Sequence, residues 1–258
     1  MTSVFYKKEL PSAAVINPED SVQPVNGFPE VCISTFSKAI IDKFASMDGV
    51  RIIAWLYTAN GRNPVYEITY GGRRLAFYLS LVGAPACICG LEEIIAMGGK
   101  RFVFFGCCGV LDEKKVGNRL ILPTGAVRDE GTSYHYYPGD IQLKPDAASS
   151  LILQSCMDRW GCPYTSGMIW TTDAIYRETA PRISERKKEG CIAVDMEYSA
   201  LLAVSRYRKV PFAQFFYGAD SLDGGIWQPR DLTDYGLSGA DNYMALALEC
   251  GLALSSAP

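Results

Sequence analysis

The strongest constraint on the fold is the apolar, β-rich run RFVFFGCCGVL at residues 101–111. A strand that is apolar at successive positions has to be covered on both faces, which is typical of the central strands of α/β sheets. The run passes into the small residues at 106–109, a pattern that predicts a tight loop at the strand end. We therefore expect a buried central strand that is covered by helices.

Strand-like and helical patterns alternate along the rest of the chain, with no second composition regime and no internal repeat. Segments with β-rich apolar runs are predicted to be strands, and segments with apolar residues at helical spacing are predicted to be helices. The predicted strands are residues 30–35, 50–59, 63–82 (a hairpin), 101–111, 118–130, 165–174 and 210–220. The predicted helices are residues 37–47, 84–99, 144–160, 184–190, 193–209 and 239–254. The sequence thus predicts an α/β fold, a single domain with a central mixed β-sheet flanked by helices.

The first residues differ from this pattern. Residues 1–28 are rich in Pro, Ser, Asn and Val without a clean period, which predicts an N-terminal arm that frays or lies over a neighbour. We expect the catalytic domain to span residues 29–258.

Composition excludes several classes of protein. The net charge is −3 and no block of Lys and Arg stands out, so nothing provides the cationic surface that nucleic-acid binding needs. No apolar run reaches the roughly 18 residues of a membrane span. The nine cysteines are an odd number for a disulfide framework, and the N-terminus lacks the apolar core of a secretion signal. We expect a cytoplasmic protein with a small-molecule partner.

A metal site is not expected. Cys87, Cys89, Cys107 and Cys108 lie in apolar or small-residue settings, no CxxC pair is present, and His135 is the only histidine. Most of the cysteines are interpreted as small buried hydrophobic residues, and His135 as a packed or interfacial histidine.

Four segments have glycine, polar side chains or both at the end of a predicted strand, which is typical of the strand ends that bind ligands in α/β sheets. They are LVGAP (81–85), FGCCGVLD (105–112), WTTDAIYRE (170–178) and FYGADSLD (216–223). A fifth polar cluster, AVDMEYSALL (193–202), is predicted to lie at a helix start instead.

In this order, the segments resemble the nucleoside phosphorylase family, which includes purine nucleoside and uridine phosphorylases. The resemblance covers residues 45–254, and its most specific part is the VDME motif at 194–197 with the downstream Asp220. It implies a homodimer or higher homo-oligomer that cleaves a nucleoside, most consistently a purine nucleoside, with phosphate to free base and ribose 1-phosphate. Phosphate is then a co-substrate, and no cofactor or metal is implied.

The resemblance also implies roles for individual residues. Cleavage passes through an oxocarbenium-like ribosyl group and a departing base, so the site needs a carboxylate on the ribose hydroxyls and an acid near the base. The implied ribose residues are Asp195, Met196 and Glu197; the acid is Asp220; the base segment holds Thr172, Ile175, Tyr176 and Arg177; the phosphate residues are Gly106, Cys107, Cys108 and a neighbouring subunit's Arg62.

Other readings of these residues stay open. Asp195 and Glu197 at a helix start also fit carboxylates that complement the helix dipole, and Asp220 also fits a strand-end cap. Arg177 and Glu178 fit either a base edge or solvent. Arg230 is a candidate partner that polarises Asp220.

The phosphate half departs from the family pattern. STFSKAI replaces a GDPxR-like loop, with Phe36 and Ile40 where glycine and arginine are expected, Phe104 where arginine is frequent, and Cys107 in place of a hydroxyl residue. Phosphate needs arginines or backbone N–H groups. Three alternatives therefore remain open: a uridine phosphorylase, a phosphate-independent nucleosidase that uses water and a general base, and a catalytically silent nucleoside-binding protein.

Overall fold

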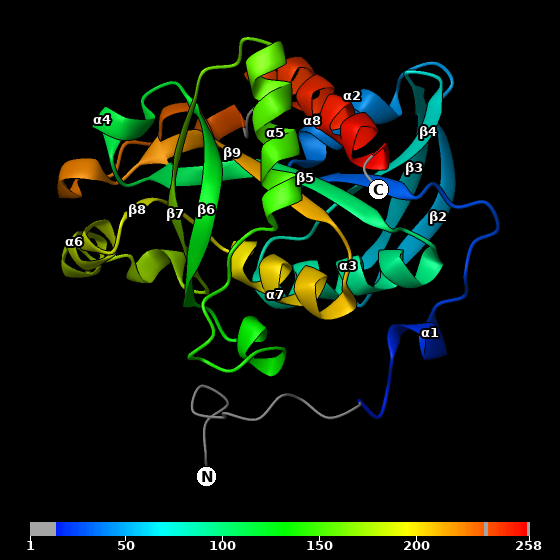
Figure 1. Cartoon of the computed structure of the whole chain (residues 1–258), viewed down its shortest axis with the longest axis horizontal. Helices are drawn as coiled ribbons and strands as arrows, with labels where there is room; N and C mark the ends of the chain where they lie inside the picture. Colours follow the sequence, from blue (N-terminus) through cyan, green and yellow to red (C-terminus); the bar gives the residue numbers. More distant parts are fainter. Residues whose placement is uncertain (1–13, 235–236, 257–258) are drawn as a thin grey trace.

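A mixed β-sheet runs through the part of the chain that this computed structural model describes, residues 14–234 and 237–256 (Figure 1). The strand order is β2-β3-β4-β1-β5-β8-β7-β6-β9, and β9 also pairs with β5. The strands are β1 Val31–Thr35, β2 Arg51–Thr58, β3 Gly61–Tyr70, β4 Arg73–Leu79, β5 Arg101–Val110, β6 Leu120–Asp129, β7 Tyr164–Thr172, β8 Cys191–Asp195 and β9 Phe212–Ser221. The pairing of β9 with both β6 and β5 closes the second half of the sheet on itself.

Helices cover both faces of this sheet. They are α1 Pro18–Ser21, α2 Lys38–Ala45, α3 Ala84–Met97, α4 Glu113–Val116, α5 Ala147–Arg159, α6 Ala180–Lys188, α7 Tyr198–Arg208 and α8 Ala240–Ser255. Figure 1 shows α3 and α7 on one face, and α5 and α8 on the other. The two largest apolar cores lie in these two layers, one with α3 and α7 and one with α2, α5 and α8. This arrangement confirms the predicted α/β fold with a central mixed sheet.

Strand β5 is the centre of the fold, as the apolar run predicts. Phe102, Phe104 and Phe105 are fully buried, because helices cover both faces of the strand. β5 pairs in parallel with β1 up to Phe105 and with β9 along almost its whole length. Beyond Phe105 the pairing with β1 ends, and at Gly109 and Val110 the strand pairs with β8 instead. A change of neighbour at a strand end is where α/β sheets form their ligand sites.

Two expectations about local structure were wrong. The predicted loop at 106–109 is the last part of β5, because Gly106 to Gly109 pair with β9. The predicted helix 193–209 is the strand β8 followed by α7, which begins at Tyr198. The cluster at 193–202 therefore starts at a strand end, like the other four segments. Residues 191–194 of β8 are apolar and buried, and they lie between β5 and β7. Pairing with these strands makes them a strand, although a helical pattern follows them in the sequence.

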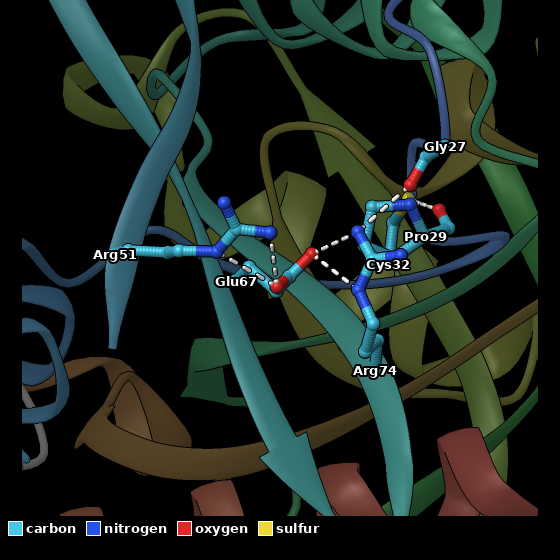
Figure 2. A network of polar contacts seen from close by, with 6 residues as sticks. All are labelled: Gly27, Pro29, Cys32, Arg51, Glu67 and Arg74. Carbon is cyan, nitrogen blue, oxygen red and sulfur yellow. Dashed lines mark hydrogen bonds and ion pairs between the residues drawn. The ribbon is translucent and has the colours of Figure 1, made fainter. Parts of the chain in front are cut away.

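A polar network fixes the outer strands and the arm (Figure 2). Glu67 on β3 is buried, and its carboxylate accepts hydrogen bonds from Arg51 on β2 and Arg74 on β4, which hold the pKa of Glu67 below its usual value. Arg74 also donates to the carbonyl of Gly27, at 2.8 Å. Of the predicted arm, residues 14–28 contain α1 and return to the body, where the Val25 N–H donates to the Met97 carbonyl. Residues 1–13 lie outside the described part.

Candidate functional site

Gly109 is the point at which the candidate segments meet. It pairs with Val194 of β8 on one side and with Asp220 of β9 on the other. A Cβ atom there would lie 2.7 Å from Leu222 Cδ1 and 2.9 Å from Val194 Cγ1, so a larger residue would displace these two side chains. The pairing places the residues after β8 and the end of β9 on either side of the last residues of β5.

Glu197 follows β8 and is buried, with an exposed fraction of 6%. Its Oε1 accepts a 2.5 Å hydrogen bond from the Gly83 N–H, which brings the 81–85 segment into the site from 114 residues away in sequence. Burial, followed by the nearby Asp195 carboxylate, raises the pKa of Glu197 to about 8. A carboxyl group of this kind exchanges a proton near neutral pH and can bond a hydroxyl as donor or acceptor.

Asp195 is the last residue of β8, and both of its carboxyl oxygens accept hydrogen bonds from other groups of the protein. Its Oδ1 accepts from the Thr171 hydroxyl at 2.7 Å, and its Oδ2 accepts from the Tyr198 N–H at 2.7 Å and the Glu197 N–H at 3.1 Å. These bonds cap the start of α7, the structural role left open by the sequence. Burial raises the pKa of Asp195 to about 7. The half-buried Met196 lies between the two carboxyl groups in sequence.

Asp220 lies at the end of β9 with an exposed fraction of 9%. Burial raises the pKa of its carboxyl group, while the hydrogen bond from Trp227 and the charge of Arg230 lower it. The Arg230 guanidinium donates to Glu113 at 2.9 Å, so it acts on Asp220 through its charge and not through a hydrogen bond. Trp227 donates its indole N–H to Asp220 Oδ2 at 2.8 Å. Sequence reasoning missed Trp227, because it lies in a loop without periodicity.

Cys107 lies on β5, two residues before Gly109. Burial, followed by the charges of Asp220 and Glu197, raises the pKa of its thiol to about 11. Because Gly109 pairs with both Val194 and Asp220, the strand ends that carry Asp195 and Asp220 lie on either side of the last residues of β5. Cys108 points elsewhere: it is buried and donates to the Tyr217 carbonyl at 3.5 Å.

The predicted base segment follows β7. Thr172 is buried, and its hydroxyl accepts from the Ala174 N–H at 3.3 Å. Ile175, Tyr176 and Arg177 form a 3₁₀ turn and are exposed, Tyr176 almost completely. Glu178 comes next and turns inward; burial, followed by the charge of Asp220, raises its pKa to about 7.

On the predicted phosphate side, apolar side chains fill the positions at which glycine and arginine are expected. The Phe36 ring covers Gly106 so closely that a Cβ atom on this glycine would lie 2.8 Å from Phe36 Cδ2. Phe104 and Ile40 are fully buried in the two cores. Arg62 does not join this region within one chain: it is exposed on β3, with its guanidinium 4.3 Å from the Trp55 ring centre, and β4 and β1 lie between β3 and β5.

Three further findings concern metal binding, a cavity at His135 and membrane crossing. Among the residues that the structure describes, no group of three or more His, Cys, Asp or Glu side chains is arranged to hold a metal ion. His135 lines a cavity of about 450 Å³ between the arm, α3 and α7. No helix within residues 14–234 and 237–256 has the length and apolar character that crossing a membrane requires.

Comparisons with known proteins agree with this geometry. Residues 53–246 match the family model described as the phosphorylase superfamily. A guanosine phosphorylase of Halorubrum lacusprofundi is 24% identical over 69% of this chain and 72% of its own length. The uridine phosphorylase of Vibrio fischeri has a similar fold, with a TM-score of 0.74 and 22% identity over 91% of this chain and 95% of that chain. An AMP nucleosidase of Bacteroides thetaiotaomicron has a TM-score of 0.69 and 19% identity over 89% and 90%.

The matched segment covers most of the chain and includes β5, β8, β9 and the base segment. The similar sequences and folds include proteins named for purine nucleosides and for uridine. The predicted resemblance is thereby confirmed: the chain belongs to the phosphorylase superfamily and is an enzyme of its pentosyltransferase type.

Proposed function

We propose that this protein cleaves the N-glycosidic bond of a purine nucleoside by phosphorolysis, releasing the free base and ribose 1-phosphate. The observation that supports this most strongly is that the end of β8, which Glu197 follows, and Asp220 of β9 flank Gly109, at the place where β5 changes its neighbour. Relatives named as guanosine and purine nucleoside phosphorylases support the choice of a purine.

In this proposal the ribose lies against Glu197 and Met196. Glu197 bonds the ribose hydroxyls, and the Gly83 N–H fixes its carboxyl group in place. Asp195 supports Glu197 by capping α7, and through that cap it sets the direction of the 195–197 segment. This arrangement stabilises the ribosyl group as positive charge develops on it.

Asp220 acts as the general acid at the base. As the glycosidic C–N bond breaks, its electron pair stays on the base nitrogen, which takes the proton of the Asp220 carboxyl group. A phosphate oxygen then forms the new bond to the ribosyl carbon. The raised pKa of Asp220 favours the protonated form that this step requires. Thr172, Ile175, Tyr176 and Arg177 line the base, with Arg177 free to bond its edge.

The phosphate is proposed to lie near Gly106, Cys107 and Cys108, on the side of β5 that β1 leaves. Backbone N–H groups can bind a dianion there, together with Arg62 of a neighbouring subunit. A homodimer or larger homo-oligomer and a cytoplasmic location belong to the same proposal, as does the division into an arm at 1–28 and a catalytic domain at 29–258.

Hydrolysis is the second candidate, and a specific observation favours it. Phe36 covers Gly106, and Phe104 and Ile40 are buried where relatives of the resembled family carry phosphate-binding arginines. A water molecule needs a general base and no anion site. Glu178, whose pKa is raised to about 7 by burial and then by the charge of Asp220, is a candidate for that base.

One experiment separates these possibilities. The purified protein is incubated with inosine, guanosine, adenosine and uridine, with and without phosphate, and the products are identified. Ribose 1-phosphate that forms only with phosphate supports phosphorolysis, and free ribose at the same rate without phosphate supports hydrolysis. Cleavage of uridine alone contradicts the purine assignment. Binding without any product would identify a silent nucleoside-binding protein.

A further inference from the structure

The loop that follows β9 returns a tryptophan to the candidate acid. Ser221 and Gln228 form an antiparallel bridge with two 2.9 Å backbone hydrogen bonds, which closes a short loop between them. Trp227 immediately precedes the returning residue of this bridge. Its indole N–H reaches Asp220 Oδ2 at 2.8 Å, and the hydrogen bond joins the two arms of the loop.

The first half of this loop is firmly anchored. Asp223 Oδ1 accepts from Lys187 of α6 at 2.6 Å, and Asp223 Oδ2 accepts from the Glu113 N–H at the start of α4 at 3.0 Å. Gly224 and Gly225 then turn the chain with positive φ angles of 76°, which favour glycine. The anchor and the turn hold the start of the loop, so the position of Trp227 relative to Asp220 is set by the backbone.

Most of the Trp227 side chain nevertheless faces solvent. It is 59% exposed and its neighbour Ile226 is 72% exposed, although large apolar side chains are usually covered. The indole can lose this exposed area only to a ligand or a partner. In the predicted base segment Ile175 is not aromatic and Tyr176 is 94% exposed, whereas the Trp227 indole is held beside Asp220 by its hydrogen bond. An indole in this position can supply an aromatic surface for a flat base.

We propose that Trp227 is a positioning residue for Asp220 and supplies the aromatic wall against which the substrate base stacks. This inference rests on the proposed function. Its N–H holds Oδ2 of Asp220, which leaves Oδ1, the oxygen nearest to Gly109, to carry the proton for the base. The exposed indole ring covers the base from the side of the loop.

The consequence for pH dependence follows from the groups around Asp220. The charge of Arg230 lowers the pKa of Asp220, and the charge of Asp220 in turn raises the pKa values of Glu178, Cys107 and Cys108. The Trp227 hydrogen bond lowers the pKa of Asp220. Trp227→Phe keeps an aromatic ring and removes the N–H, so the pKa of Asp220 rises and the acid stays protonated to higher pH.

The test compares Trp227→Phe, Trp227→Leu and the control Trp160→Phe, which alters an exposed tryptophan at the end of α5. We expect Trp227→Phe to move the alkaline limb of the pH profile of kcat/KM upward by about 0.5–1 unit with KM nearly unchanged. Trp227→Leu shows the same shift and in addition raises KM for the nucleoside about tenfold, since base stacking on an aromatic ring is worth about 1–3 kcal/mol. Trp160→Phe changes neither quantity.

Wild-type activity in the same assay tests the proposed function separately. If the wild type cleaves nucleosides and both Trp227 variants keep its pH profile and KM, the role of Trp227 is refuted and the function stands. A second measurement does not need turnover: inosine should quench the intrinsic fluorescence of the wild type and of Trp160→Phe, and this quenching should be lost in Trp227→Phe. Equal quenching in Trp227→Phe contradicts the aromatic wall, whether or not the protein is active.

Discussion

Two stretches of β5 differ in chemistry although they belong to one strand. On the carboxyl side, where the last residues of β5 lie between β8 and β9, buried carboxyl groups follow or end these strands and their pKa values are raised. On the β1 side, where β5 pairs with β1, lie Phe36 and the fully buried Phe104. Buried carboxyl groups cost free energy that packing alone does not return, whereas buried aromatic rings stabilise the core. The difference indicates that the carboxyl side serves chemistry and that the aromatic rings of the β1 side serve packing.

The carboxyl side can be tested most directly at Asp220. We expect Asp220→Asn to reduce kcat for a purine nucleoside by roughly 10²- to 10⁴-fold, the range of a lost general acid, while substrate binding changes little. Steady-state kinetics and equilibrium binding measure the two effects. Asp241→Asn, at an exposed carboxylate on α8, is the control. An unchanged kcat in Asp220→Asn removes this residue from the proposed mechanism.

Glu197→Gln is expected to have a smaller effect, on binding and turnover together. The amide oxygen can still accept from Gly83, but the exchangeable proton of the carboxyl group is lost together with the bonds to ribose that the proposed function assigns to it, which corresponds to about 10- to 100-fold in kcat/KM. Inhibition by ribose-containing and ribose-free purines locates the loss. Retained affinity and activity would show that Glu197 serves only to hold the Gly83 N–H.

The β1 side is tested by removing the Phe36 side chain. Phe36→Gly uncovers Gly106, so we expect KM for phosphate to fall about tenfold, the value of one hydrogen bond to a charged group, while the protein loses about 1–3 kcal/mol of stability. Phe36→Leu is the matched control, because it keeps an apolar side chain over the glycine. If Phe36→Gly leaves the phosphate dependence unchanged, phosphate does not bind at this place.

The buried carboxyl groups also predict how stability depends on pH. The folded pKa of Glu197, about 8, lies above its ordinary value of 4.5, so the folded protein holds this proton more tightly than the unfolded chain. The contribution of Glu197 to the free energy of unfolding is therefore fully present below pH 4.5, and it is lost as the pH rises through about 8. The free energy of unfolding in urea should be lower at pH 8.5 than at pH 5. Glu197→Gln should make this difference smaller by at least about 1 kcal/mol, since one pKa unit is worth 1.36 kcal/mol. Identical pH profiles in the two proteins contradict this assignment.

The smallest effect is expected at Arg62. Arg62→Ala removes the stacking on Trp55, which is worth about 0.5–1 kcal/mol at an exposed site. If a neighbouring subunit's Arg62 also contacts phosphate, KM for phosphate rises a few-fold while KM for the nucleoside stays constant. Arg73→Ala, at an exposed arginine on β4, is the comparison. An equal phosphate KM in the two variants places Arg62 outside the site.

Sequence reasoning succeeded where one pattern dominated. The continuous apolar run gave β5, and the alternation of patterns gave the sheet and its flanking helices. It failed at β8, because residues 191–194 are a short apolar stretch that merges with the helical pattern of α7. Only pairing with β5 and β7 separates the two, and this pairing is not local.

The site was predicted in part for the same reason. Asp220, Glu197 and Asp195 were predicted from their resemblance to a family motif, and the structure places the ends of β8 and β9 on either side of Gly109. The Gly83 bond to Glu197 spans 114 residues, and no local pattern encodes it. Trp227 gave no signal, because its contact depends on two glycines and a bridge that return the chain to Asp220.

The change of neighbour along β5 also bears on how such an enzyme can be altered. Phe36, which follows β1, lies over Gly106, whereas β8 and β9 flank Gly109. Phe36 takes no part in the bonds that cap α7, so it can be exchanged without breaking that cap. Under the proposed function, an engineer could alter the acceptor of the ribosyl group at Phe36 while leaving the groups that act on the base as they are.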